Sequence, residues 1–283
     1  MKRIVGVDFN EVGKIYWFNP GPLTIQKGTK VVVETVRGLE LATAATPIKE
    51  VEDSEVQFEL KDIIRIASEK DIKQYEENLV KADTSLEKVK VIVKEYKLEM
   101  KLLGCEYTLD GTKLLIYYNA EGRVDFRELV KALASEFKVR IELRQIGPRE
   151  GAKKIGAIGT CGREVCCKKH IREFDLVTMK MAKEQGMALS SNKIAGVCGK
   201  LMCCIGYESA AYEELRKRVP GVGDIVKTPT CEKCKVISTD YLREIIKTEN
   251  DGAIEQWEAK QVKKIKSSKQ KDDITEEEKK LED

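Results

Sequence analysis

The sequence is poor in histidine and aromatic residues, and it has no long apolar run. It contains one histidine in 283 residues, and aromatic residues make up 6% of the chain. No stretch approaches the roughly 18 consecutive apolar residues that a membrane span needs. The opening MKRIVGVDFNEVGKIYWF alternates like a strand and holds no apolar run of signal-peptide length. We therefore expect a cytoplasmic protein that does not insert into a membrane.

Several motifs of enzymes are also absent. The sequence has no G-x-G-x-x-G, no P-loop and no H-E-x-x-H, and it lacks the C-x₃-C-x₂-C spacing of radical chemistry. With a single histidine, acid–base catalysis would fall to carboxylates or lysines, and no constellation of these points to a reaction. The sequence favours a non-catalytic protein, and a redox or nucleic-acid-modifying enzyme is the alternative.

The charge balance gives little support for binding to nucleic acid. Charged residues make up 35% of the chain, but the net charge is only +3, so no overall basic field is expected. Aromatic residues interleaved with lysine and arginine would support RNA binding, yet they are scarce, and IYWF fits a core equally well. Direct RNA binding therefore stays open but disfavoured.

Nine cysteines are the most informative part of the composition. Cytoplasmic thiols are kept reduced, so clustered cysteines in such a chain more often hold metal or do redox chemistry than form structural disulfides. Cys105 stands alone in MKLLGCEYTL, and we expect it to be a small buried apolar residue. The other eight cysteines lie between positions 161 and 234.

Six of these eight belong to a repeated phrase. GTCGREVCC begins at position 159 and GVCGKLMCC begins at position 196, so the offset is 37 residues. No solenoid family fits one repeated phrase in otherwise different surroundings, which favours two matched sets of metal ligands. The candidate metal ligands are Cys161, Cys166, Cys167, Cys198, Cys203 and Cys204.

Other residues of the phrases would support such a role. The glycines let the backbone turn tightly beside the sulfurs, and N–H groups near such turns can donate to metal-bound sulfur. Arg163 and Lys200 would offset the negative charge of several thiolates. If Cys203 and Cys204 open a helix that runs to Val219, the helix dipole would help as well.

The spacing favours iron–sulfur over zinc. Structural zinc sites use C-x₂₋₄-C pairs, whereas each phrase here has C-x₄-C followed directly by a second cysteine. Adjacent cysteines point in different directions, which suits bridging to different irons or sharing between two clusters or two chains. Plant-type iron–sulfur sites also use a C-x₄-C step. Zinc, redox thiols and structural cysteines remain the alternatives.

Two further features near the phrases are weaker signals. Cys231 and Cys234, in CEKC at an expected hairpin tip, are tentative metal ligands, and a redox pair or two thiols without a role are the alternatives. His170 follows Cys167 by three residues and could be a ligand. After two lysines, however, a solvent-exposed histidine at a helix end is the better interpretation.

The order of sequence patterns predicts an α+β fold. Small antiparallel β units are expected at both ends, around an α-β-β-α-β middle, with a cysteine-rich helical insert. The predicted segments are a β unit (1–68), the α+β middle (69–150), the cysteine-rich helical segment (151–220), a small β-barrel-like unit of three or four strands (221–264) and a charged, disordered tail (265–283).

Local patterns predict the elements of the middle. Apolar residues spaced by three and four over 71–96 indicate one long helix or two short ones, with a weak point at Asp83-Thr84-Ser85. The DG at 110–111 predicts a hairpin over 99–120. Asp125 is expected to cap a helix. That helix places four residues on one face: Leu129, Val130, Leu133 and Phe137.

The cysteine-rich segment should contain two further helices. One is expected over 175–186, ending at Gly186, and another over 207–219, stopped by Pro220. A helix of about 11 residues spans only about 16 Å, so the chain can return between the two phrases. We therefore expect the two phrases to lie next to each other.

Four stretches of the sequence resemble the RicT (YaaT) family of bacterial cytosolic proteins. They are CGREVCC, MKMAKEQG, NKIAGVCGKLMCC and the early VVVETVRGLELA, and the resemblance covers roughly residues 3–260. The core of this family is the homology domain also found at the C-terminus of a eukaryotic polymerase-suppressor protein. CEKC is a departure, because that turn is usually cysteine-free in the family.

The resemblance implies a function. It implies a subunit of a complex with two small helical partners, RicA and RicF, that carries [4Fe–4S] clusters. The complex promotes RNA maturation by the membrane-bound endoribonuclease RNase Y and supports sporulation, competence and biofilm development. The six repeat cysteines would be the cluster ligands, and at least one cluster would sit at a partner interface. A zinc-binding or redox-active nucleic-acid-associated protein is the alternative function.

Overall fold

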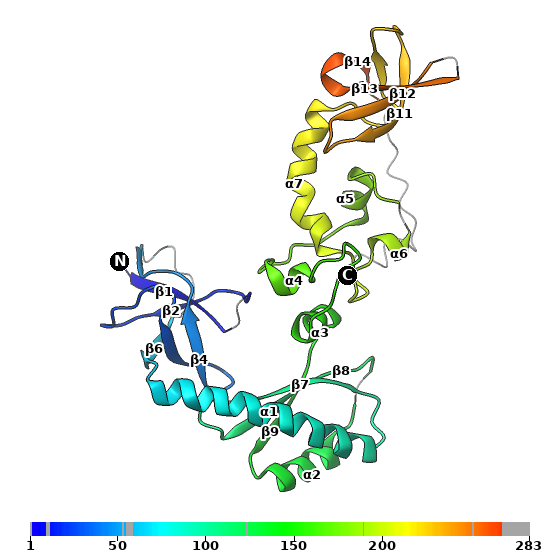
Figure 1. The fold of residues 1–283 in the computed structure, drawn as a ribbon. Coiled ribbons are helices and arrows are strands. Elements are labelled where there is room, and N and C mark those ends of the chain that lie inside the picture. Colours follow the sequence, from blue (N-terminus) through cyan, green and yellow to red (C-terminus); the bar gives the residue numbers. More distant parts are fainter. Residues whose placement is uncertain are drawn as a thin grey trace. The chain divides into compact units, whose positions relative to one another are not determined.

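The computed structural model describes residues 2–9, 12–52, 54, 59–122, 124–188, 190–250 and 252–267. The chain divides into two compact units, Met1–Glu173 and Phe174–Asp283 (Figure 1). Helices and strands are both abundant, and the predicted α+β class is confirmed. The division between the units runs through the segment 151–220 and puts the two cysteine phrases in different units. The finer five-part division stays a prediction.

The N-terminal strands form a closed barrel. The pairings run in the order β2-β6-β3-β4-β1, and β1 pairs again with β2. β5 continues the edge of β1 beyond β4. The strands are β1 (Lys2–Asp8), β2 (Tyr16–Asn19), β3 (Lys30–Glu34), β4 (Leu39–Ala44), β5 (Lys49–Val51) and β6 (Lys61–Ile66).

Two details of this barrel differ from the expected antiparallel unit. β2 and β6 run parallel, and their pairing closes the barrel. β5 was not predicted, since three residues carry too little pattern. Val31 and Val33 of β3 belong to the barrel core, and Val32 between them is buried as well. The buried core consists of Val5, Val7, Phe18, Ile25, Val31, Val33, Ala42, Ala44 and Ile63.

The middle of the chain has the predicted α-β-β-α-β order. β7 and β8 pair as an antiparallel hairpin, and β9 lies parallel to β8. A parallel neighbour requires a crossover, which α2 provides. The elements are α1 (Glu69–Glu95), β7 (Lys101–Tyr107), β8 (Lys113–Asn119), α2 (Arg127–Phe137) and β9 (Arg140–Gln145).

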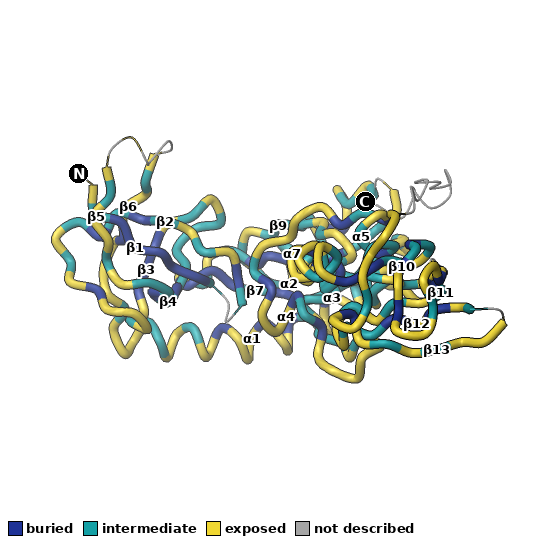
Figure 2. Tube along the Cα trace, turned by 90° about the horizontal axis from the view of Figure 1, so that it is seen from above, coloured by how far each residue is buried: buried dark blue, intermediate teal, exposed yellow. Residues whose placement is uncertain are grey.

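The predicted weak point does not interrupt α1, which is one helix of 27 residues. Ser68 caps it in a capping box with Asp71. Hydrogen bonds from Arg65 and Ser68 hold the pKa of the Asp71 carboxyl far below its usual range. At the weak point, the Ser85 hydroxyl lies 3.0 Å from the Tyr107 hydroxyl inside the core. The buried residues of α1 form one stripe, and most of the helix is exposed (Figure 2).

α2 begins later than predicted. Phe126 is its N-cap residue, and Asp125 instead accepts a hydrogen bond from the backbone N–H of Arg127 at 3.2 Å. Leu129 and Leu133 pack in the core with α1 and the sheet, as expected. Phe137 packs against this core, whereas Val130 is half-buried and lines a pocket together with Leu129.

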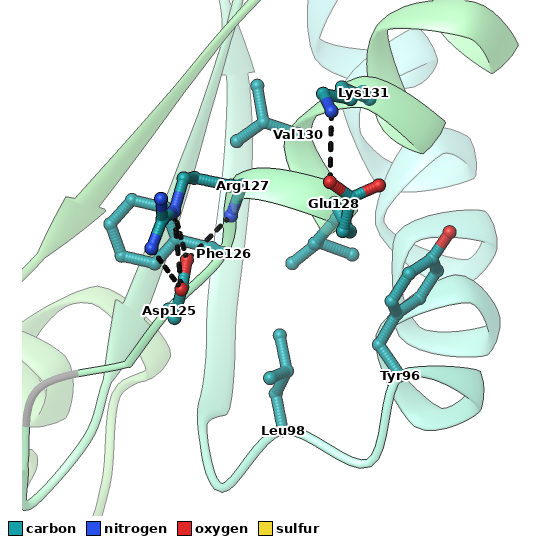
Figure 3. Close-up of a pocket in the computed structure, with 9 residues that line it drawn as sticks. Tyr96, Leu98, Asp125, Phe126, Arg127, Glu128, Val130 and Lys131 are labelled. Atoms are coloured by element: carbon teal, nitrogen blue, oxygen red, sulfur yellow. Dashed lines mark hydrogen bonds and ion pairs between the residues drawn. The ribbon is translucent and has the colours of Figure 1, made fainter.

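This pocket of about 710 Å³ lies between the end of α1 and the start of α2 (Figure 3). Its charged side chains are paired with one another. Arg127 contacts Asp125 at 2.8 Å, and Lys131 contacts Glu128 at 2.9 Å. The pocket is lined by Tyr96, Leu98, Asp125, Phe126, Arg127, Glu128, Leu129, Val130 and Lys131.

The described part of the C-terminal unit contains three α-helices, a short 3₁₀ helix and an antiparallel sheet of five strands, ordered β13-β12-β11-β10-β14. Three or four strands were predicted. The tail predicted from residue 265 begins inside β14, and residues 268–283 lie outside the described residues. The elements are α5 (Met179–Glu184), α6 (Ser191–Ile194), α7 (Cys203–Arg218), β10 (Ile225–Lys227), β11 (Cys234–Asp240), β12 (Ile245–Asn250), β13 (Ala253–Glu258), η2 (Ala259–Gln261) and β14 (Lys263–Lys266).

The helices of this unit start and stop at recognisable residues. α5 is shorter than predicted, because Thr178 caps it, accepting from the backbone N–H of Met181. Gly186, with φ of +71°, ends that helix turn as predicted. α7 begins at Cys203, so two candidate ligands do open a helix, and it ends at Arg218 ahead of Pro220. None of the described helices has the length and apolar content that crossing a membrane requires.

Candidate metal centre

The first cysteine phrase folds as a tight hairpin, which we call the first cysteine hairpin (residues 157–167). α3 (Pro148–Ile155) leads into it, and Ile158 bridges to Glu164. The backbone N–H of Gly159 donates to the Arg163 carbonyl at 2.8 Å. Gly162 turns the chain with φ of +76°. α4 (Cys166–Lys169) then starts at the paired cysteines.

The second cysteine hairpin (residues 194–204) repeats this geometry. Ala195 bridges to Leu201, and the N–H of Gly196 donates to the Lys200 carbonyl at 2.8 Å. Gly199 turns the chain with φ of +79°. α7 starts at the paired cysteines. Each of these contacts lies 37 positions after its counterpart, so the sequence repeat is also a structural repeat.

Within each hairpin the sulfurs occupy equivalent places. The Sγ of Cys161 lies 3.5 Å from the position that a Cβ on Gly159 would take. The Sγ of Cys198 lies 3.7 Å from the same point on Gly196. The paired cysteines occupy the first two positions of the following helix. In the turns, the N–H of Gly162 donates to the Gly159 carbonyl and the N–H of Gly199 donates to the Gly196 carbonyl, both at 2.9 Å.

The six candidate ligands carry thiols and differ in exposure. Cys161 is exposed and Cys167 is buried, while the remaining four are half-buried. Cys204, the counterpart of Cys167, is therefore more exposed than its partner in the repeat. Most of the candidate ligands are at least partly exposed. A metal cluster that is shared with a partner protein requires ligands that are accessible in this way.

One cysteine hairpin does not assemble a complete metal site by itself. In the described ranges, no three His, Cys, Asp or Glu side chains gather closely enough to hold a metal ion. The first hairpin belongs to the unit Met1–Glu173 and the second to the unit Phe174–Asp283. The expectation that the two phrases adjoin stays a prediction, and the metal-ligand roles of the six cysteines stay predictions as well.

The other residues that the sequence singled out can be located in the structure. Arg163 and Lys200 hold equivalent positions, each with its carbonyl accepting from the first glycine of its hairpin, and Arg163 is exposed. His170 is exposed at the C-terminal end of α4, which confirms the helix-end interpretation. Cys105 is 9% exposed in the core beneath α1, which confirms the buried apolar interpretation.

Long-range contacts that sequence reasoning missed hold the first hairpin. The Lys154 ammonium on α3 pairs with the Glu106 carboxylate and lies 4.2 Å from the centre of the Tyr117 ring. Gly104 makes room, because a Cβ there would meet the Lys154 side chain at 2.6 Å. Beyond the hairpin, Arg172 pairs with Asp8 of the barrel at 2.9 Å. Lys154 and Glu106 are 48 residues apart, and Arg172 and Asp8 are 164 residues apart. Contacts over such distances in sequence leave no local pattern that could predict them.

The second hairpin is held by a small apolar core. Gly206 of α7 lies against Val177, so that a Cβ would meet it at 2.9 Å. The Gln185 side-chain amide also donates to the Ile205 carbonyl at 2.6 Å. Buried residues of the hairpin, α5, α6 and α7 make up this core: Val177, Met179, Ala182, Ile194, Leu201 and Ile205.

Cys231 and Cys234 are joined in a disulfide at the turn between β10 and β11. The predicted hairpin tip is therefore present. In this state neither sulfur offers a thiolate to a metal, so the predicted ligand role applies only to the reduced pair. That role stays a prediction.

Replacing Gly199 with alanine should loosen the second hairpin by about 1–2 kcal/mol, because an L-residue at this positive φ is strained. Nothing lies within 4 Å of a Cβ there, so crowding does not contribute. Hydrogen exchange of the Gly196 N–H should speed up accordingly. Gly147→Ala, at φ of −67° and also in open space, should leave exchange unchanged. Equal protection in both variants would contradict the expectation.

Comparison with known families defines the class of protein. Residues 61–146, from β6 to just past β9, match the model described as the PSP1 C-terminal conserved region. Residues 176–219, which hold α5, α6, the second cysteine hairpin and α7, match the PSP1-like protein, third domain. The scaffold is thus that of a PSP1-domain protein.

One relative resembles nearly the whole chain. The chain is 40% identical over 249 residues to the stage 0 sporulation protein YaaT of Bacillus subtilis (strain 168), covering 88% of this chain and 90% of that protein. The chain therefore belongs to the YaaT (RicT) family, as the cysteine phrases indicated.

Two fungal proteins share a shorter region. The uncharacterized protein PB7E8.02 of Schizosaccharomyces pombe is 49% identical over 49 residues. Protein PSP1 of Saccharomyces cerevisiae is 47% identical over 47 residues. Each match covers 17% of this chain and 6% of the fungal protein. No solved structure matches the chain.

Proposed function

We propose that the chain is a non-catalytic regulatory subunit whose repeat cysteines hold iron–sulfur clusters of the [4Fe–4S] type. The observation that carries the proposal is the structural repeat of the two cysteine hairpins, each carrying three thiols on the same backbone geometry. Its relative YaaT is a sporulation-stage protein by name, which supports a role in developmental regulation. The bound cluster supplies an oxygen- and redox-sensitive link between sulfurs.

The residues present fit such a cluster. A [4Fe–4S] cluster takes four thiolates, one more than a single hairpin contains. The turns place Cys161 and Cys198 equivalently in the two hairpins. Arg163 and Lys200 hold equivalent positions in the two hairpins, and their positive charge would offset the negative charge of nearby thiolates. The chain's own residues thus bind the group, orient it and partly neutralise its charge.

Partners complete the ligand set in this proposal. Candidates are small helical proteins of the RicA and RicF kind. The assembled complex would promote RNase Y-dependent RNA maturation and thereby sporulation, competence and biofilm formation. Support comes from the partial exposure of most candidate ligands and from the number of thiols, three in each hairpin. The charged side chains that line the pocket at α2 form ion pairs with one another, Arg127 with Asp125 and Lys131 with Glu128. This pairing supports a role without catalysis in that pocket.

Anaerobic purification tests the cluster directly. The chain, alone and with its partners, should carry iron and acid-labile sulfide in comparable amounts, with visible absorption that oxygen bleaches. Iron, sulfide and zinc are measured on the same samples. Stoichiometric zinc without sulfide, in the anaerobic complex as well, would sink the proposal and favour the zinc alternative.

A further inference from the structure

The turn that carries Cys231 and Cys234 holds its two cysteines together through its backbone. Val226 of β10 is in register with Cys234 of β11. The backbone N–H of Cys231 donates to the Thr228 hydroxyl at 3.0 Å, and the Thr228 N–H donates to the Cys231 carbonyl at 2.8 Å. The Cα atoms are 6.0 Å apart, within the range that a disulfide spans. Because these contacts do not involve the sulfur–sulfur bond, the turn should persist after reduction.

The two sulfurs differ in access. Cys234 is 1% exposed and lies in the first position of β11, whereas Cys231 is partly exposed at the tip of the turn. The buried Thr228 hydroxyl lies 3.7 Å from the Cys234 sulfur. An external molecule can therefore reach Cys231 more easily than Cys234. This asymmetry is that of an exchanging sulfur paired with a resolving one.

We propose that Cys231 and Cys234 form a reversible dithiol–disulfide couple that exchanges with low-molecular-weight disulfides, with Cys231 as the exchanging sulfur. In the oxidising direction, the Cys231 thiolate attacks one sulfur of the small disulfide. That sulfur–sulfur bond breaks, and one small thiol leaves with the electron pair. The Cys234 thiol loses its proton to water and attacks the Cys231 sulfur, which releases the second small thiol. Two protein thiols are oxidised, and one small disulfide is reduced to two thiols.

The couple is a site separate from the cluster ligands. Its loop spans only three positions, so closing it changes the entropy of the unfolded chain little. The bond is therefore better suited to switching than to holding the fold. The site lies in the sheet of the C-terminal unit, and the six repeat cysteines belong to other segments. Its redox state should change without changing iron content.

Differential alkylation of the anaerobic full chain tests the couple. Samples are equilibrated with mixtures of reduced and oxidised glutathione, and thiols are blocked with one alkylating reagent. After reduction, the released thiols are labelled with a second reagent. Mass spectrometry of the peptide holding both cysteines should show a transition that follows a two-electron dependence on the glutathione ratio. A pair that stays reduced, or stays oxidised, across the whole series would overturn the proposal.

Single variants separate the two sulfurs. Cys234→Ser should leave Cys231 carrying glutathione as a mixed disulfide, since no resolving thiol remains. In Cys231→Ser, oxidised glutathione should modify Cys234 at least about tenfold more slowly than it modifies Cys231 in Cys234→Ser, because Cys234 is buried. Equal rates in the two variants would contradict the assigned roles. Iron content should match that of the unmodified chain in both, and a loss of iron would show that the pair is a ligand pair instead.

Discussion

Replacing Cys203 with serine is expected to remove most of the iron and most of the partner binding of the chain together. Cys203 lies at the end of the second cysteine hairpin, where it opens α7, and it is partly exposed. Serine has almost the same shape and is well tolerated at a helix start, but it is a poor ligand for iron in clusters. Cys198→Ser, at the hairpin tip, should act in the same way. Iron, sulfide and co-purification of the partners are measured side by side, with circular dichroism as the check on folding.

The matched control is Cys105→Ser, which changes a cysteine in the core beneath α1. It should lose stability while keeping both iron and partners, because Cys105 lies outside the two hairpins. One result would separate the two halves of the proposal. If the Cys203 and Cys198 variants bind partners as the unmodified chain does while losing all iron, the cluster is not an interface element. The regulatory mechanism would then have to be redrawn.

The middle of the fold was predictable because its signals are local. The three-and-four spacing of apolar residues specifies α1, and the DG at 110–111 specifies the turn between β7 and β8. Barrel closure was not predictable, because it depends on pairing β2 with β6, more than 40 residues away. The start of α2 was misjudged by one residue for a different reason. Asp125 does accept an N–H bond from Arg127, the first residue of α2, but the N-cap residue is Phe126.

The candidate site shows the same contrast. The repeated cysteine phrase is visible in the sequence, and Gly162 and Gly199 at positive φ explain why the second glycine of the phrase recurs. The contacts that place α3 are not visible, since Lys154, Glu106 and Gly104 meet only after the sheet has formed. Arg172 and Asp8 likewise come from opposite ends of one unit. Spacing points to the candidate ligands, whereas tertiary packing decides where their hairpins lie in each unit.

The stability of the chain should fall by about 2 kcal/mol between pH 8 and pH 10.5 through Cys105 alone. Burial, with a contribution from Glu106 and an opposing one from Lys154, raises the pKa of the Cys105 thiol from 9.0 to about 12. In the folded chain the thiol therefore stays protonated well above pH 9. The unfolded chain ionises near its ordinary pKa, and this lowers its free energy. The contribution is fully present below pH 9 and is lost as the pH rises towards 12.

Urea unfolding of the unmodified chain and of Cys105→Ala over this pH range isolates the effect. The variant has no thiol to titrate at this position, so the difference in unfolding free energy between the two proteins should shrink as the pH rises. Burial and nearby carboxylates also raise the pKa of Tyr75 and of Tyr117, but these groups are present in both proteins and cancel in the difference. A difference that stays constant from pH 8 to pH 10.5 would mean that water reaches the Cys105 sulfur and that the sheet beneath α1 opens more readily than its packing indicates.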